Sequence, residues 1–314
     1  MVAPTGGYTG LVISALAFVL LLFSPSPPPS PFRVEAVARE TPDGPVRAWI
    51  ARVDLTDPRV SFVVTGPMER RAADPPRAEA RLVPTDVWAE GAGAALAVNA
   101  GFFARLDGAT TPGWTDGLPV DVLGLARSEG RTVSPPRRGD GEGAPPDPAL
   151  LIDETEGERC PCVVRAALAG EGDLDGVEDA VAGLGTRGGR PGTLLVEEGE
   201  DRGASAQVAP TERHPRTAAG VSRDGRTLLL AVADGRQPAW SVGLTLPELA
   251  RLLIEAGAWN AVNLDGGGSS AMWYREPGSG PGRVLNRPSD GRVRPVASHL
   301  GVRVDADRVL PAPK

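Results

Sequence analysis

The segment from Ala261 to Trp273, AVNLDGGGSSAMW, contains residue types that could bind and act on an anion. A short apolar run ends in Asp265, and three glycines and two serines follow it. A buried strand that opens into a glycine loop lets the backbone approach a ligand closely. Amides and hydroxyls in such a loop can converge on an anion. Asp265 stands at the carboxyl end of the strand, where ligands commonly bind in α/β sheets, and it is the leading candidate carboxylate.

A second signal for an anionic ligand lies in the segment ERHPRT, residues 212–217, which holds two arginines and one of the two histidines of the chain. The planar guanidinium fork of arginine suits bidentate contact with phosphate or carboxylate. Arg216 is therefore a candidate phosphate ligand. The segment leads into a predicted hairpin of strands 217–221 and 227–232, which closes at Asp234, a second candidate carboxylate.

Residues that begin and end helices and strands predict the elements around these candidates. The segment TLPE, residues 245–248, has the form of a helix capping box, and Gly257 predicts the end of that helix. A strand over 259–265 then carries Asp265. Another buried strand over 94–100 holds Asn99 near its end, so we expect these two strands to be neighbours or near neighbours that bring Asn99 and Asp265 to a shared cleft.

The remaining chain alternates short strands with polar turns, which predicts an α+β fold: a single mixed domain with a largely antiparallel or mixed sheet and a few helices. Residues 134–160 and 170–190 are rich in glycine, proline and acidic residues and predict surface loops. Further strands are predicted at 46–55, 59–64, 118–126, 193–196 and 299–304, and a further helix at 85–93.

Composition excludes several chemistries. The only lysine is Lys314, so a Schiff-base lysine and a P-loop lysine are both absent. Two histidines argue against a multi-histidine zinc site, and a net charge of -7 disfavours nucleic-acid binding. We expect neither a cofactor nor a metal. Cys160 and Cys162 are separated by one residue, which would strain a disulfide between them, and we interpret them as an incidental pair.

The N-terminal residues 1–31 predict a signal peptide or an N-terminal membrane anchor followed by a proline-rich tether. Their uncharged run from Leu11 to Phe23 is short for a membrane span, which needs about 20 residues. Both interpretations export the rest of the chain, as a periplasmic, cell-surface or secreted protein.

The motifs occur together, and in the same order, in one family. VNAGFF, HPRTAAG, VADGR, GLTLPELARLLIEAGAWNAVNLDGGGSSAM and NRPSDGRVRPV resemble the phosphodiester glycosidase family. The resemblance implies a domain over 46–305, with 134–190 as a variable insert of loops. It also implies an exported hydrolase that cleaves a sugar-1-phosphodiester, so the expected partner is a phosphorylated sugar or polysaccharide.

The leaving group in that reaction is a phosphate, already a stable anion, so it needs less protonation than the alkoxide of an ordinary glycoside. The site needs a phosphate clamp and a carboxylate that acts as base or stabilises charge. Asp265 and Asp234 are the catalytic candidates. The candidates for substrate binding are Asn99, Gly101, Arg216, Gly266, Gly267, Gly268, Ser269 and Ser270.

Three alternatives stay open at this point. A serine hydrolase would use Ser269 or Ser270 with His299, although the motif G-x-S-x-G is absent. A non-catalytic envelope module would bind phosphorylated polysaccharide with the same residues. A metal-dependent phosphodiesterase is disfavoured by the histidine count, although clustered carboxylates could hold Ca²⁺ or Mg²⁺.

Overall fold

The computed structural model describes residues 29–106, 108, 113–136, 146–153, 163–185, 192–206, 208–276 and 280–305. In these ranges the chain forms five sheets, in which every strand pair is antiparallel, and two α-helices. The prediction of antiparallel sheets with few helices is confirmed. The fold is nevertheless dominated by sheet rather than balanced between helix and sheet.

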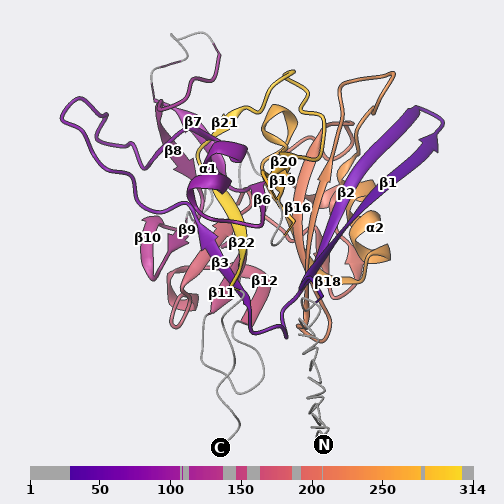
Figure 1. The fold of residues 1–314 in the computed structure, drawn as a ribbon, viewed down its shortest axis with the longest axis horizontal. Helices are drawn as coiled ribbons and strands as arrows, with labels where there is room; N and C mark the ends of the chain where they lie inside the picture. Colours follow the sequence, from indigo (N-terminus) through magenta and orange to yellow (C-terminus); the bar gives the residue numbers. More distant parts are fainter. Residues whose placement is uncertain are drawn as a thin grey trace, which may run out of the picture.

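The largest sheet has seven strands and carries the candidate site at one end. Its long β1–β2 hairpin forms one edge of the molecule, beside α2 (Figure 1). In spatial order its strands are β1 (Phe32–Thr41), β2 (Gly44–Asp54), β17 (Thr227–Ala233), β16 (Arg216–Ser222), β18 (Ala258–Asn263), β14 (Val196–Glu197) and β15 (Glu200–Asp201).

Four smaller sheets complete the fold. The second sheet consists of β20 (Arg283–Val284), β19 (Met272–Tyr274), β6 (Leu96–Asn99), β22 (His299–Val304) and β3 (Val60–Val64). The third consists of β10 (Arg131–Ser134), β9 (Ala126–Ser128), β13 (Asp179–Ala182), β11 (Asp147–Asp153) and β12 (Val163–Ala169). The last two are β4 (Ala80–Arg81), β8 (Pro119–Leu123) and β7 (Phe102–Arg105), and the pair β21 (Pro295–Val296) and β5 (Val83–Pro84).

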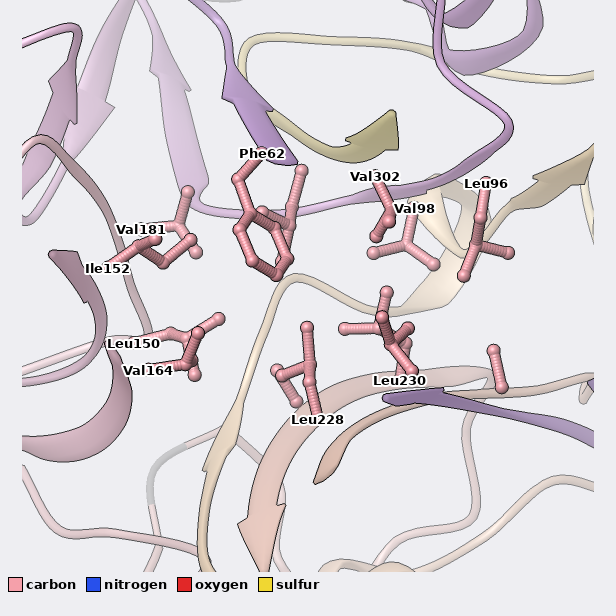
Figure 2. Packing of buried hydrophobic residues seen from close by; sticks show 14 of the residues in the cluster. Phe62, Leu96, Val98, Leu150, Ile152, Val164, Val181, Leu228, Leu230 and Val302 are labelled. Atoms are coloured by element: carbon pink, nitrogen blue, oxygen red, sulfur yellow. The ribbon is translucent and has the colours of Figure 1, made fainter. Parts of the chain in front are cut away.

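The main hydrophobic core lies where the first three sheets meet. Leu228 and Leu230 come from the seven-stranded sheet, Val98 from the second sheet, and Leu150 and Ile152 from the third (Figure 2). All five are essentially inaccessible to solvent. Burial of apolar area at this junction stabilises the fold by roughly 25 cal/mol per Å² and fixes the three sheets against one another.

The opposite face of the seven-stranded sheet is covered by α2 (Leu246–Glu255), and α1 (Thr85–Gly91) packs beside β6. The predicted capping box is confirmed: Thr245 Oγ1 accepts a hydrogen bond from the Glu248 amide at 3.3 Å, and the Glu248 carboxylate accepts one from the Thr245 amide at 2.9 Å. Gly257 follows the helix with φ +97°, the left-handed conformation that glycine adopts at helix ends.

Two sequence interpretations need correction. Residues 32–41 form β1, paired along its whole length with β2, so the folded region begins before residue 46. The described parts of 134–190 are not only loops, because β11, β12 and β13 form most of the third sheet. Flanking prolines and glycines obscured the short apolar run of β11, which is buried along nearly its whole length.

The prediction for the N-terminal segment concerns residues that lie almost entirely outside the described ranges, as do Cys160 and Cys162. In the part of the chain that the structure describes, no helix combines the length and the apolar character that a membrane span needs.

Candidate active site

The glycine loop begins at Asp265, two residues after β18, and its residues Gly267–Ser269 form a single 3₁₀ turn. A side chain at Gly266 would come within 2.7 Å of the Pro215 carbonyl oxygen. Gly267 has φ +63°, and its amide donates to that same carbonyl at 2.8 Å. Since this bond occupies the Gly267 amide, the loop cannot offer all three glycine amides to a phosphate. The glycines are needed because the loop lies directly against the segment before β16.

Asn99 fixes the loop to the second sheet. Its side-chain amide donates to the Asp265 carbonyl at 2.5 Å, and its Oδ1 accepts from Thr217 Oγ1 at 2.8 Å and from the Ala271 amide at 3.1 Å. The strands β6 and β18 belong to different sheets and do not pair, yet their ends meet here, so the expected closeness of Asn99 and Asp265 is confirmed as a contact to the Asp265 backbone. The shared cleft stays a prediction. Asn99 is completely buried and holds the loop in place.

Gly101 lies just beyond β6 and is also buried. A Cβ there would lie 3.5 Å from the Ala182 carbonyl oxygen and 3.6 Å from Ser298 Oγ, which is ordinary contact. Gly101 is thus packed against other residues of the protein.

Arg216 is buried beneath the segment that precedes β16. Its guanidinium donates to four carbonyl oxygens, those of Leu244 at 3.0 Å, Val208 at 3.0 Å, Ala209 at 2.7 Å and Glu212 at 2.9 Å. Burial, followed by the nearby charge of Arg236, lowers the pKa of Arg216 to about 10. With these donors committed to backbone, the geometry favours a role for Arg216 in organising residues 208–216.

Asp234 is buried at the end of β17 and accepts several hydrogen bonds. Trp240 Nε1 donates to it at 2.7 Å, Asn286 Nδ2 at 3.1 Å and the Arg287 amide at 2.9 Å. Burial raises the pKa of Asp234, and these donors oppose the rise. Asn286 in turn donates to the Ser270 carbonyl at 3.0 Å, so Asp234 supports the far end of the glycine loop through Asn286.

Asp265 differs from Asp234 because its carboxylate is half-buried and has few donors. Burial raises its pKa to about 6, and the Ser269 hydroxyl, the charge of Arg294 and the Gly266 amide only partly offset that rise. Ser269 Oγ acts on the carboxylate from nearby without forming a hydrogen bond of standard geometry. A carboxyl with a pKa close to neutral can both take up and release a proton, as acid–base catalysis requires.

Two arginines that were not among the sequence candidates pack directly on the loop. A Cβ on Gly267 would lie 3.2 Å from the terminal nitrogens of Arg236, and one on Gly268 would overlap Arg294 and Asp290. Arg236 is exposed and has φ +59°, a strained conformation of the kind that clusters at functional sites.

Both arginines lie in motifs that resemble the family, VADGR and NRPSDGRVRPV. A D-G pair predicts a turn. Neither motif shows by itself that the side chain of Arg236 or Arg294 packs on the glycine loop.

The two loop serines supply further donors. Ser269 and Ser270 are buried, and neither hydroxyl has a hydrogen-bond partner within the described residues. A buried unpaired hydroxyl costs free energy, so a hydrogen bond to a ligand or a water molecule would stabilise each of them.

His299 cannot serve these serines as a base in the observed arrangement. Thr65 Oγ1 lies 2.9 Å from its Nδ1, the Val83 carbonyl oxygen lies 3.1 Å from its Nε2, and its ring stacks on Trp88. Burial lowers the pKa of His299 to about 3, so the ring is neutral and both nitrogens are occupied. The serine-hydrolase alternative therefore lacks its base. Among the described residues, no group of three or more His, Cys, Asp and Glu side chains is arranged to hold a metal ion.

Comparison with known proteins identifies the family. The sequence model described as phosphodiester glycosidase matches residues 92–303, about two thirds of the chain. The chain belongs to the phosphodiester glycosidase family. Its matched region contains β6, the glycine loop, and both Arg236 and Arg294. As a member of this family the chain is expected to be a hydrolase.

One curated relative is similar to part of the chain. The chain is 37% identical over 118 residues to the SPbeta prophage-derived uncharacterized protein YomE of Bacillus subtilis, and this match spans only 17% of that protein.

Among solved structures, the catalytic domain of zebrafish N-acetylglucosamine-1-phosphodiester alpha-N-acetylglucosaminidase, auto-inhibited by its pro-peptide, has a TM-score of 0.59. It is 20% identical, and the match covers 87% of this chain and 83% of that one. A Burkholderia pseudomallei protein whose name describes it as exported has a TM-score of 0.53 at 18% identity, covering 83% and 74%. At these identities the structures share the fold.

The position of Asn99 leads to a prediction. Asn99→Ala removes three hydrogen bonds and leaves the Thr217 and Ala271 donors unpaired, so we expect the free energy of unfolding to fall by about 2–4 kcal/mol. Chemical denaturation measures the change. The control is Asn260→Ala, in the half of β18 that lies away from the glycine loop. It removes one exposed hydrogen bond, which the Glu198 amide donates to Asn260, and should cost less than about 1 kcal/mol. Equal losses for the two variants would contradict the special role of Asn99.

Proposed function

We propose that this protein hydrolyses a sugar-1-phosphodiester, releasing the sugar and a phosphomonoester. The observation that supports this best is the packing of the exposed Arg236 guanidinium on the glycine loop, two residues from the half-buried carboxyl of Asp265. One side of the loop thus presents a cation for the phosphate. Asp265 supplies a proton acceptor for the reacting water.

Arg236 is a better phosphate ligand than Arg216 in this arrangement. Its contacts to His214 Nδ1 are long, at 3.4 Å, so its donors stay free for a ligand. Arg294 holds Asp290 through two hydrogen bonds, and Arg216 holds four carbonyls. Phosphate oxygens are matched by the parallel donors of a free guanidinium.

Asp265 acts on the sugar side of the bond. Water attacks the anomeric carbon, Asp265 accepts its proton, and the bond from that carbon to the phosphate oxygen breaks. The phosphate leaves as an anion that Arg236 stabilises, so no strong acid has to protonate it. The sugar receives the hydroxyl group, and atoms and charge balance.

The first test is paired kinetics of Arg236→Ala. The variant should lose about 10²–10³-fold in rate on a sugar-1-phosphodiester, because one preorganised charge contact is removed. On an uncharged aryl glycoside of the same sugar the loss should be much smaller, since that substrate presents no phosphate.

Arg226→Ala is the matched control, because Arg226 is exposed at the opposite end of the same β16–β17 hairpin. Equal losses on both substrates would show that Arg236 does not bind the phosphate. Substrate binding without any turnover by the unmodified protein would favour the non-catalytic binding module.

The second test concerns Asp265. Turnover should rise as the pH rises through about 6, where the carboxyl loses its proton, and Asp265→Asn should abolish most of it. Because burial raises this pKa, the ionised carboxylate destabilises the folded state above that pH. The variant should therefore be as stable as the unmodified protein at pH 8, or more stable by up to about 2 kcal/mol after allowance for solvent screening. A variant that keeps normal turnover would identify Asp265 as a turn residue.

We also propose that residues 1–31 direct export of the domain. The apolar run from Leu11 to Phe23 and the prolines after it support this. A reporter fused after residue 305 should be accessible to protease added outside intact cells or spheroplasts. A reporter that stays protected in the cytosol would contradict export.

A further inference from the structure

The Asp290–Arg294 ion pair lies directly over the glycine loop. Arg294 Nε is 2.8 Å from Asp290 Oδ2, and Nη2 is 3.2 Å from Oδ1, so the pair is bidentate. The two side chains are only 18% and 31% exposed. A Cβ on Gly268 would overlap both groups, which means that the pair occupies the space a loop side chain would otherwise fill.

A second segment holds the pair in place. The Trp114 ring centroid lies 5.7 Å from Arg294 Cζ, and Arg292 donates to the Trp114 carbonyl at 3.0 Å. The segment 290–294 is therefore fastened to the segment around residue 114 as well as to the loop. Charged groups that are partly buried and held on several sides interact strongly with their neighbours, because solvent screens them poorly.

We propose that the Asp290–Arg294 pair is a positioning pair that controls the proton on Asp265 and so sets the pH range in which the enzyme works. The inference rests on the proposed role of Asp265. Arg294 favours the ionised carboxylate against the cost of burial. Asp290 limits this effect, because its negative charge partly neutralises that of Arg294.

Several other charged groups surround the loop. Arg236, after β17, packs on Gly267, His214 lies on the segment before β16, and Arg216 begins that strand. Glu212 contacts His214 at 3.1 Å on that segment. The charge of Arg294 lowers the pKa of Asp265. The other groups stay unchanged in the variants below.

Variants of the two members of the pair should shift the pKa of Asp265 in opposite directions. Arg294→Gln removes the positive charge, so the pKa of Asp265 should rise by about one pH unit. Asp290→Asn leaves the Arg294 charge without its partner, so the pKa of Asp265 should fall. General damage to the loop would not move the two variants in opposite directions.

Gly268→Ala tests the geometry with both charges retained. Gly268 lacks the positive φ of Gly267, and the added methyl meets the side-chain ends of Arg294 and Asp290 rather than backbone. The methyl should push the pair off the loop, and the pKa of Asp265 should rise as in Arg294→Gln. An alanine at Gly266 would instead meet the Pro215 carbonyl and disturb the loop itself.

The pKa can be measured without a substrate, by NMR of the full chain labelled with ¹³C at the aspartate carboxyls. The Asp265 signal is the one missing from Asp265→Asn. We expect a higher pKa in Arg294→Gln and Gly268→Ala, a lower pKa in Asp290→Asn, and no change in Arg226→Gln.

Shifts in one common direction, or none, would overturn the inference. If Arg294→Gln does not fold, the other two variants decide it. If the shifts occur as expected but Asp265→Asn retains turnover, the proposed catalytic role of Asp265 fails, while the control of its proton stands.

Discussion

The whole site depends on the side chain of Asn99. It is a neutral amide in a fully buried position, and it bonds at once to the Asp265 carbonyl, the Thr217 hydroxyl and the Ala271 amide. These partners come from both ends of the glycine loop and from β16. One side chain therefore ties the end of β6, in the second sheet, to the glycine loop and to β16 of the seven-stranded sheet. Since a buried amide must satisfy its donors and acceptors, the loop has little freedom to move away.

Once the loop is held there, its three glycines decide what can lie against it. Gly266 lets the Pro215 carbonyl approach, Gly267 admits the guanidinium of Arg236, and Gly268 admits the Asp290–Arg294 pair. A side chain at Gly267 or Gly268 would push these charged groups off the loop, and one at Gly266 would push away the Pro215 carbonyl. The glycines thus act less as a phosphate cradle of amides than as a flat surface on which charged side chains gather.

Local patterns predicted much of this arrangement. The capping box of α2, the β16–β17 hairpin and the strand ahead of Asp265 were all predictable, because each depends on periodicity or on turn residues close in sequence. The strand β1 was not predicted because the prolines before it dominated the interpretation of its segment. The third sheet was missed because β11 is a short buried strand between polar stretches of sequence, which lacks the alternation of a half-exposed strand.

The site was predicted in part. Asp265 and the loop follow from their own motif, whereas the uses of Arg216, Asp234 and Asn99 depend on which distant carbonyls and amides they meet. Arg236 and Arg294 reach the loop from segments 29 residues before and after Asp265, which no local pattern can indicate.

The central claim is that Asp265 and Arg236 direct water to the sugar carbon of a phosphodiester. Hydrolysis of a panel of sugar-1-phosphodiesters in ¹⁸O-labelled water, followed by mass analysis of both products, tests it directly. The account predicts the label on the released sugar and an unlabelled phosphomonoester. Label on the phosphate would contradict it, because the attack would then be at phosphorus, and so would the absence of turnover across the panel.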